Sequence, residues 1–238
     1  MLSPLLTWDR KNQGLRNALH LDGIPLGEHA IRIAELRRLH HHTIVRIDGE
    51  APPFVFCLPY ALKLCVSLTR VINKTYKELI IGKNLWFVGI PFADWLVRRL
   101  TPIDRPEPGC LVFYFRSKQW AHAGRFVRCG AVVSKWGMFP AYEHGMWEIP
   151  LSYGDEVRCY QMPGEHEVVR LFLEFGVEVG LKAKLGTGWA SEELVRSASV
   201  MAPAPVRFLH ATCQHGAVPC RPAPGAPGGR SLRNGGVQ

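Results

Sequence analysis

The sequence predicts an α+β protein, and two observations carry that prediction. Of the 238 residues, 47% are hydrophobic and 21% are charged, which is the balance of a globular chain that buries a core. Helical patterns come first, four short strand patterns follow between residues 110 and 160, and a helical pattern comes after them. Segregated helices and strands are typical of α+β folds, and the short connections between the strands favour antiparallel pairing.

Residues 1–50 are predicted to form an extension that packs on the core. Residues 28–40 repeat apolar side chains at helical spacing, which predicts an amphipathic helix, and residues 43–47 alternate as a short strand. Three consecutive histidines, 40–42, join the two elements. Consecutive side chains diverge, so at most two of them could share one metal ion, and we favour a solvated helix end instead.

The next predicted helix follows the break at Pro52 and Pro53 and covers residues 59–68. Pro59 is acceptable only in the first turn of a helix, where its missing N–H is not needed. Cys57 is therefore expected at or beside the helix N-terminus, as the first member of an inward stripe that continues with Ala61, Leu64, Cys65 and Leu68. A further helix is predicted at residues 91–100.

Four strands are predicted next, with turn residues between them, at 111–115, 121–127, 131–136 and 156–160. Residues 166–181 then predict a helix, and residues 190–197 another turn or two. From residue 201 the chain is rich in Pro, Gly and Ala, which predicts a disordered tail. The expected organisation is an extension at 1–50, a domain at 51–200 and a tail at 201–238.

The charge and cysteine content restrict location and partners. The net charge is +9, but the arginines are scattered rather than grouped, so nucleic acid is not the expected partner. The longest apolar stretch is shorter than the roughly 20 residues that a membrane span needs, and the first residues do not resemble a secretory signal. Seven irregularly spaced cysteines without a CxxC pair favour reduced thiols in a cytoplasm, with non-classical export left open.

Cys57 is the candidate nucleophile. A helix N-terminus favours the thiolate, which is the form that attacks a carbonyl. The free N–H groups of the first turn, those of Cys57 and Leu58, could also bind a developing oxyanion. The alternative is a buried structural cysteine, since free cysteine is among the most buried residue types.

His122 is the candidate general base, because it lies in a predicted strand among small residues that would allow a helix to approach. A hairpin that pairs Gly124 with Ser134 places Ser134 diagonally beside His122, where its hydroxyl could orient the imidazole. A slip of one residue would bring Lys135 there instead. His144 and Glu143 compete as the third member.

Four segments resemble the papain-like cysteine hydrolases of the NlpC and CHAP type, and suggest a divergent bacterial branch of uncharacterised proteins. Residues 56–62 (FCLPYAL) resemble the helix that begins with the nucleophile, and residues 109–115 (GCLVFYF) resemble the family's GDLVFF strand. Residues 122–127 (HAGRFV) resemble its histidine strand, and residues 132–137 (VVSKWG) the strand with the third residue.

The resemblance implies a papain-like fold, with N-terminal helices on an antiparallel sheet of about four to six strands and a C-terminal helix. It implies hydrolysis of a peptide or other amide through a thioester on Cys57, with His122 as base, Ser134 as orienting residue, and no metal or cofactor. Two alternatives stay open: a catalytically silent module that binds a partner through the same groove, and an acyltransferase or transamidase that uses the same pair. The oligomeric state is left open.

Overall fold

The computed structural model describes residues 6–7, 12–19, 24–25, 27–47, 55–73, 89–128 and 130–178. The chain divides into two compact units, Met1–Ala204 and Pro205–Gln238, and every described residue belongs to the first. None of the helices in these described ranges has both the length and the apolar character that crossing a membrane requires.

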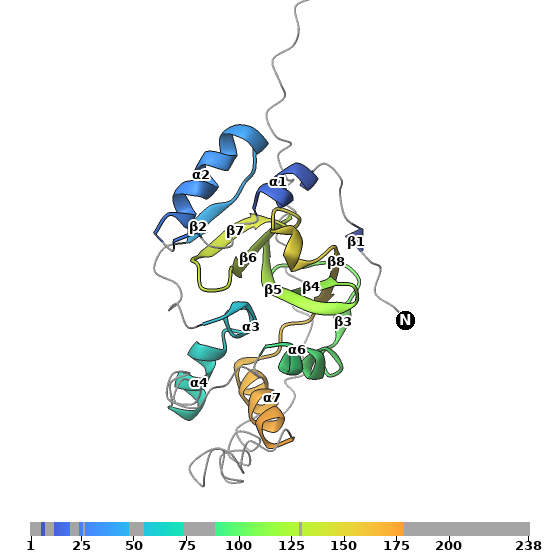
Figure 1. Ribbon diagram of the computed structural model, residues 1–238. Coiled ribbons are helices and arrows are strands. Elements are labelled where there is room, and N and C mark those ends of the chain that lie inside the picture. The colour runs from blue at the N-terminus through green and yellow to red at the C-terminus, as the bar shows by residue number, and fades with distance from the viewer. Residues whose placement is uncertain are drawn as a thin grey trace, which may run out of the picture. The chain divides into compact units, whose positions relative to one another are not determined.

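One antiparallel sheet of eight strands forms the centre of this unit (Figure 1). The strands follow one another across the sheet in the order β1-β8-β4-β5-β6-β7-β2, and β3 pairs with β8 beside this path. Their bounds are β1 Leu6–Thr7, β2 Val45–Ile47, β3 Pro102–Ile103, β4 Leu111–Arg116, β5 Gln119–Arg128, β6 Ala131–Lys135, β7 Ala141–Gly145 and β8 Glu156–Tyr160.

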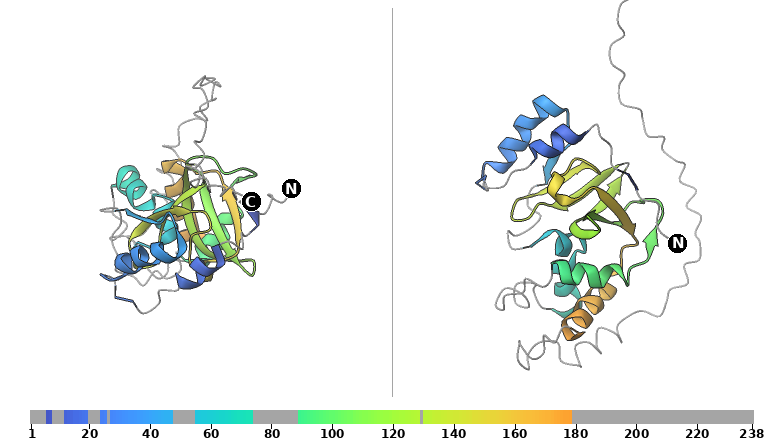
Figure 2. Two further views of the ribbon diagram at one scale, coloured as in Figure 1. Left: turned by 90° about the horizontal axis from the view of Figure 1, so that it is seen from above. Right: turned by 45° about the vertical axis from the view of Figure 1, so that its right-hand side comes forward.

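Helices cover both faces of the sheet, as Figures 1 and 2 show. One face carries α3 Cys57–Ala61, α4 Leu64–Ile72, α6 Ile90–Val97 and α7 Glu165–Glu178. The other face carries α1 Gln13–Ala18, α2 His29–His40 and the short 3-10 helix η4 Leu151–Tyr153. Two hydrophobic cores follow from this arrangement, one on each face.

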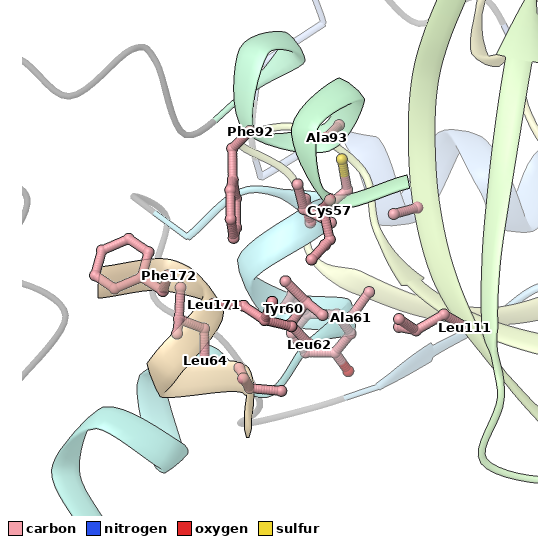
Figure 3. Close-up of a cluster of buried hydrophobic side chains, with 14 of the residues drawn as sticks. Cys57, Tyr60, Ala61, Leu62, Leu64, Phe92, Ala93, Leu111, Leu171 and Phe172 are labelled. Atoms are coloured by element: carbon pink, nitrogen blue, oxygen red, sulfur yellow. The ribbon is translucent and has the colours of Figure 1, made fainter. Parts of the chain in front are cut away.

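The first core joins α3, α4, α6 and α7 to the sheet (Figure 3). Leu111, Phe113 and Ala123 supply the sheet side, and Cys57 is one of the buried side chains from α3. Aromatic rings fix the angle between α6 and α7, with the ring centroids of Phe92 and Phe175 5.0 Å apart.

The second core lies under α1 and α2 and is more polar. Its largest side chains on this side are those of Tyr114 and Tyr142 from the sheet and of Trp136, which follows β6, each at most 1% exposed. Four buried histidines lie in or beside this second core, namely His29, His42, His122 and His144. Because buried polar groups need partners, this core contains most of the buried side-chain hydrogen bonds that follow below.

The predicted α+β class and the positions of most elements are confirmed. The four predicted strands appear as β4, β5, β6 and β8, and the helices predicted at 28–40, 91–100 and 166–181 appear as α2, α6 and α7. The predictions for residues 190–197 and for the tail at 201–238 lie outside the described residues.

Two details of the prediction are wrong. Residues 59–68 do not form one helix, because Lys63 adopts a left-handed conformation with φ 54° and separates α3 from α4. The sheet has more than the expected four to six strands, because β7 forms where no strand is predicted and the short strands β1 and β3 add to the sheet. The predicted strand at 43–47 appears as β2 and joins the sheet beside β7.

Candidate functional site

Cys57 is the first residue of α3, as the sequence predicts. The preceding residue, Phe56, has an extended backbone with ψ 175° and serves as the N-cap. All five residues of α3 are buried, and Cys57 itself is 9% exposed (Figure 3). The short helix thus presents its first side chain to the sheet rather than to open solvent.

Backbone N–H groups surround the sulfur of Cys57. Three N–H groups act on it as donors, those of Ala123, a residue of β5, of Leu58 and of Cys57 itself. Ala123 is fully buried in the first core, and its small side chain allows α3 to lie directly on β5. The predicted close approach of a helix to this strand is therefore confirmed, at Ala123.

Lys135, the last residue of β6, supplies the charge at this site. Its side chain is completely buried, and its Nζ donates hydrogen bonds to the carbonyl oxygens of Gly137 at 2.9 Å and Phe139 at 2.8 Å. Burial lowers the pKa of Lys135 to about 8, while its electrostatic attraction to Cys57 acts in the opposite direction.

The pKa of Cys57 reflects the competition between burial and these neighbours. Burial raises the pKa of the thiol to about 11, and the N–H groups together with the charge of Lys135 act to lower it. Desolvation outweighs the helix position that the sequence analysis relied on. The resting thiol is therefore protonated near neutral pH, and its activation needs a base or a change in solvation.

His122 does not meet Cys57, which corrects the predicted pair. Successive residues of a strand point to opposite faces, so His122 points away from α3 when Ala123 points toward it. On the neighbouring strand β4, the residue paired with His122 is Tyr114, which belongs to the second core. The ring of His122 stacks on that of Tyr153, with the centroids 4.0 Å apart. Burial lowers the pKa of His122 well below its usual value, and its Nε2 finds no hydrogen-bond partner among the described residues.

Ser134 shares the sheet face of His122, and the predicted pairing of Gly124 with Ser134 is confirmed. Its hydroxyl is engaged elsewhere, however. It donates to Nε2 of His144 at 2.8 Å and accepts from Nε1 of Trp136 at 3.0 Å. Ser134 therefore does not orient His122. Its side chain lies on the face of the sheet opposite to Cys57.

The two competing third members are engaged with partners of their own. His144 donates from Nδ1 to the carbonyl of Gly145, which leaves Nε2 as the acceptor for Ser134. Burial lowers the pKa of His144 to about 4. Glu143 pairs with Arg128, whose side chain is largely exposed.

The sequence places Lys135 in the site only if the hairpin register slips by one residue and brings it beside His122 in place of Ser134. The signal that could have found it lies in the confirmed register. If Gly124 faces Ser134, the next position along the same register puts Lys135 across from Ala123, on the face that the helix approaches. A lysine on the face of β6 that a helix covers is the unusual feature of this strand.

The histidine run at 40–42 is not gathered around one point. His41 is exposed and left-handed at the end of α2, whereas His42 is buried, with its Nε2 donating to the carbonyl of Ile33 at 2.9 Å. The interpretation of this run as a solvated helix end is therefore correct for His41 but not for His42, which is buried. In the described ranges, no three His, Cys, Asp or Glu side chains are grouped for a metal ion.

In comparisons with known proteins, no family model, no curated protein and no solved structure matches this chain.

Proposed function

We propose that the chain is a cysteine-dependent amide hydrolase with a papain-like layout, in which Cys57 is the nucleophile and Lys135 its basic partner. The observation that carries the proposal is the surroundings of the sulfur. The backbone N–H groups of Ala123, Leu58 and Cys57 itself act on the sulfur, and the charge of the buried Lys135 adds a weaker electrostatic attraction, at the start of a helix that lies on an antiparallel sheet. These donors and the cation act in the direction that activates a thiol, against the burial that keeps Cys57 protonated at rest.

The hydrogen bonds of Lys135 suit a base. A neutral amine has two N–H donors and one lone pair, and the carbonyls of Gly137 and Phe139 take the two donors. The lone pair is then free to accept a proton. A pKa of about 8 leaves a fraction of Lys135 neutral near pH 7, where an ordinary lysine would be almost wholly protonated.

In this mechanism the neutral amine of Lys135 takes the thiol proton, and the sulfur forms a bond to the carbonyl carbon of an amide. The bond between that carbon and the amide nitrogen then breaks, and the nitrogen leaves as an amine with the proton from Lys135. Water breaks the thioester, which releases a carboxylic acid and restores the thiol.

Acylation by an activated ester tests this proposal. The full chain is incubated with p-nitrophenyl acetate, and release of nitrophenol is followed together with the intact mass. We expect a burst of one acetyl group per chain, attached to Cys57 as a thioester that hydroxylamine removes. Lys135→Arg keeps the charge but cannot act as a base, so acylation should fall by about a hundredfold or more.

His122→Gln is the matched control, since His122 lies on the other face of the sheet. It should keep the burst, provided that circular dichroism shows a folded protein. An acetyl group on other residues while the Cys57 thiol stays free would overturn the proposal. Added amine acceptors in the same assay distinguish a transferase, which would give an amide product, from a hydrolase.

A second candidate function is a catalytically silent module that binds a partner. The burial of Cys57 and its pKa of about 11 favour it, because both describe an unreactive thiol. This candidate predicts no burst in the wild-type protein and an equal, slow acylation in the Lys135→Arg variant.

A further inference from the structure

Two further cysteines lie side by side on the second face of the sheet. In the pairing of β4 with β8, Val112 faces Cys159. Cys110 comes two residues before Val112, and side chains two apart share a face, so Cys110 lies diagonally beside Cys159. The two thiols are in contact and share a hydrogen bond.

This pair is separate from the proposed site. Cys110 and Cys159 belong to the second core, whereas Cys57 belongs to the first, on the opposite face of the sheet. Both thiols are 3% exposed, and both are free. Nothing in the proposed hydrolase mechanism uses them.

A bond between the two sulfurs needs a small shift of the chain at Cys110 or at Cys159. A disulfide requires closer Cα atoms than a diagonal pair in a flat sheet provides. Cys110 precedes the first residue of β4 and follows Gly109, which has φ +93° and no neighbour within 4 Å of its Cβ position. Its backbone N–H donates to the carbonyl of Glu107 within the turn. Two further hydrogen bonds tie the turn to Phe126 of β5, one from the N–H of Gly109 and one to the carbonyl of Cys110, so a shift at Cys110 has to carry the backbone of Phe126 with it.

We propose that Cys110 and Cys159 are a redox-sensitive pair that forms a disulfide when the protein meets a peroxide. The thiolate of Cys110 attacks one peroxide oxygen, the O–O bond breaks, and the products are a sulfenic acid and water. The thiol of Cys159 then attacks the sulfenic sulfur, forms the S–S bond and releases a second water. One peroxide is reduced and two thiols are oxidised.

The electrostatics of the pair assign the roles. The hydrogen bond with Cys159 lowers the pKa of Cys110, and the same interaction raises the pKa of Cys159. Cys110 is therefore the thiol that ionises first and attacks, and Cys159 is the resolving thiol that stays protonated until the sulfenic acid has formed.

Peptide mapping tests the proposal on the full wild-type chain. The protein is treated with hydrogen peroxide, unfolded in iodoacetamide and digested with trypsin. Cleavage at arginine gives peptide 100–116, with Cys110 as its one cysteine, and peptide 159–170, with Cys159 as its one cysteine. We expect these two peptides linked and two hydrogens lighter than their sum, with dithiothreitol separating them again.

Two variants and one stability measurement make the result specific. The linked product should disappear in Cys159→Ser and persist in Cys65→Ser, whose thiol lies on α4. Because the bond closes a loop of about 50 residues, the oxidised wild-type protein should melt on the order of 10 °C higher than the reduced one. Alkylation of both thiols after peroxide, or Cys110 oxidised to a sulfinic acid without linkage, would overturn the proposal.

Discussion

Along β5, Ala123 faces α3 while His122 and Gly124 face the second core. Because the side-chain period of a strand is two residues, no small adjustment of β5 brings His122 to Cys57. The same alternation on β6 sends Ser134 to the second core and Lys135 to the first. Lys135 is therefore the basic side chain of these two strands that acts on Cys57.

Ser134→Ala should destabilise the protein without affecting the thiol. The substitution leaves Nε1 of Trp136 without its acceptor and Nε2 of His144 without its donor, and both groups are buried. Each unsatisfied group costs about 1–3 kcal/mol, so the free energy of unfolding should fall by about 2–4 kcal/mol. Urea denaturation measures this loss, with the exposed Ser152→Ala as control.

The same variant distinguishes the predicted catalytic role of Ser134 from the structural one. If Ser134 oriented a catalytic histidine, Ser134→Ala would slow the acylation of Cys57. We expect the acylation rate to stay at the wild-type value at temperatures where the variant is folded.

Part of this site could be predicted from the sequence. Pro59 fixed the start of the helix near Cys57, and the symmetric hairpin gave the correct register between Gly124 and Ser134. The small residues beside His122 predicted that a helix approaches this histidine. Ala123 and Gly124 point to different faces of β5, however, and the helix lies on the face of Ala123. Sequence alone does not tell which face of β5 receives the helix, because that depends on packing between distant elements.

At the scale of elements, the connection from η4 to β8 depends on Gly154. Its backbone has φ 121° and ψ 170°, a conformation available essentially to glycine alone. A Cβ on this residue would lie 2.4 Å from the carbonyl oxygen of Phe115. The end of β4 and the start of β8 can approach only because this side chain is absent.

Gly154→Ala should therefore lower the free energy of unfolding by about 3 kcal/mol or more, from backbone strain together with the clash. Gly164→Ala is the matched control, since its Cβ would meet nothing within 4 Å. Guanidinium denaturation of both variants measures the difference. Equal stability of the two would show that the turn at Gly154 is not constrained as described.

Lys63 offers a stabilising change at the break between α3 and α4. A left-handed conformation costs a residue with a side chain about 1–2 kcal/mol, and glycine adopts it freely at some cost in chain entropy. Lys63→Gly should raise the free energy of unfolding by up to about 1 kcal/mol. Lys63→Val should lower it, and urea denaturation of the two variants shows whether the sign reverses.

Element positions were predictable where hydrophobic periodicity was strong, as in β4 and α7. The break at Lys63 was not, because the apolar pattern continues through residues 59–68 and lysine does not signal a left-handed turn. The strand β7 was missed because Ala141–Gly145 has no β-branched residue, and pairing with β6 and β2 decides its conformation.

At the scale of the whole molecule, the second core holds neutral histidines that make stability depend on pH. Burial lowers the pKa of both His29 and His144 to about 4, compared with about 6.5 in an unfolded chain. Between these values the unfolded state binds protons that the folded state does not. Stability is therefore complete above pH 6.5 and is lost as the pH falls toward 4.

We expect the melting temperature to fall steeply between pH 6.5 and 4, with each of these two histidines contributing up to about 3 kcal/mol of the loss. His29→Gln should make this fall shallower. His41→Gln, at an exposed position at the end of α2, should leave it unchanged. A slope that is the same in both variants would show that His29 is not the buried neutral group described.

We propose Lys135, and not His122, as the charged partner of Cys57. The most direct test is the pH dependence of Cys57 alkylation by iodoacetamide, measured on the tryptic peptide 47–63, which contains no other cysteine. Because the charge of Lys135 favours the thiolate, Lys135→Met should raise the apparent pKa of Cys57 and slow its alkylation at pH 8. His122→Gln should keep the wild-type profile. A shifted profile in His122→Gln beside an unchanged one in Lys135→Met would contradict the claim.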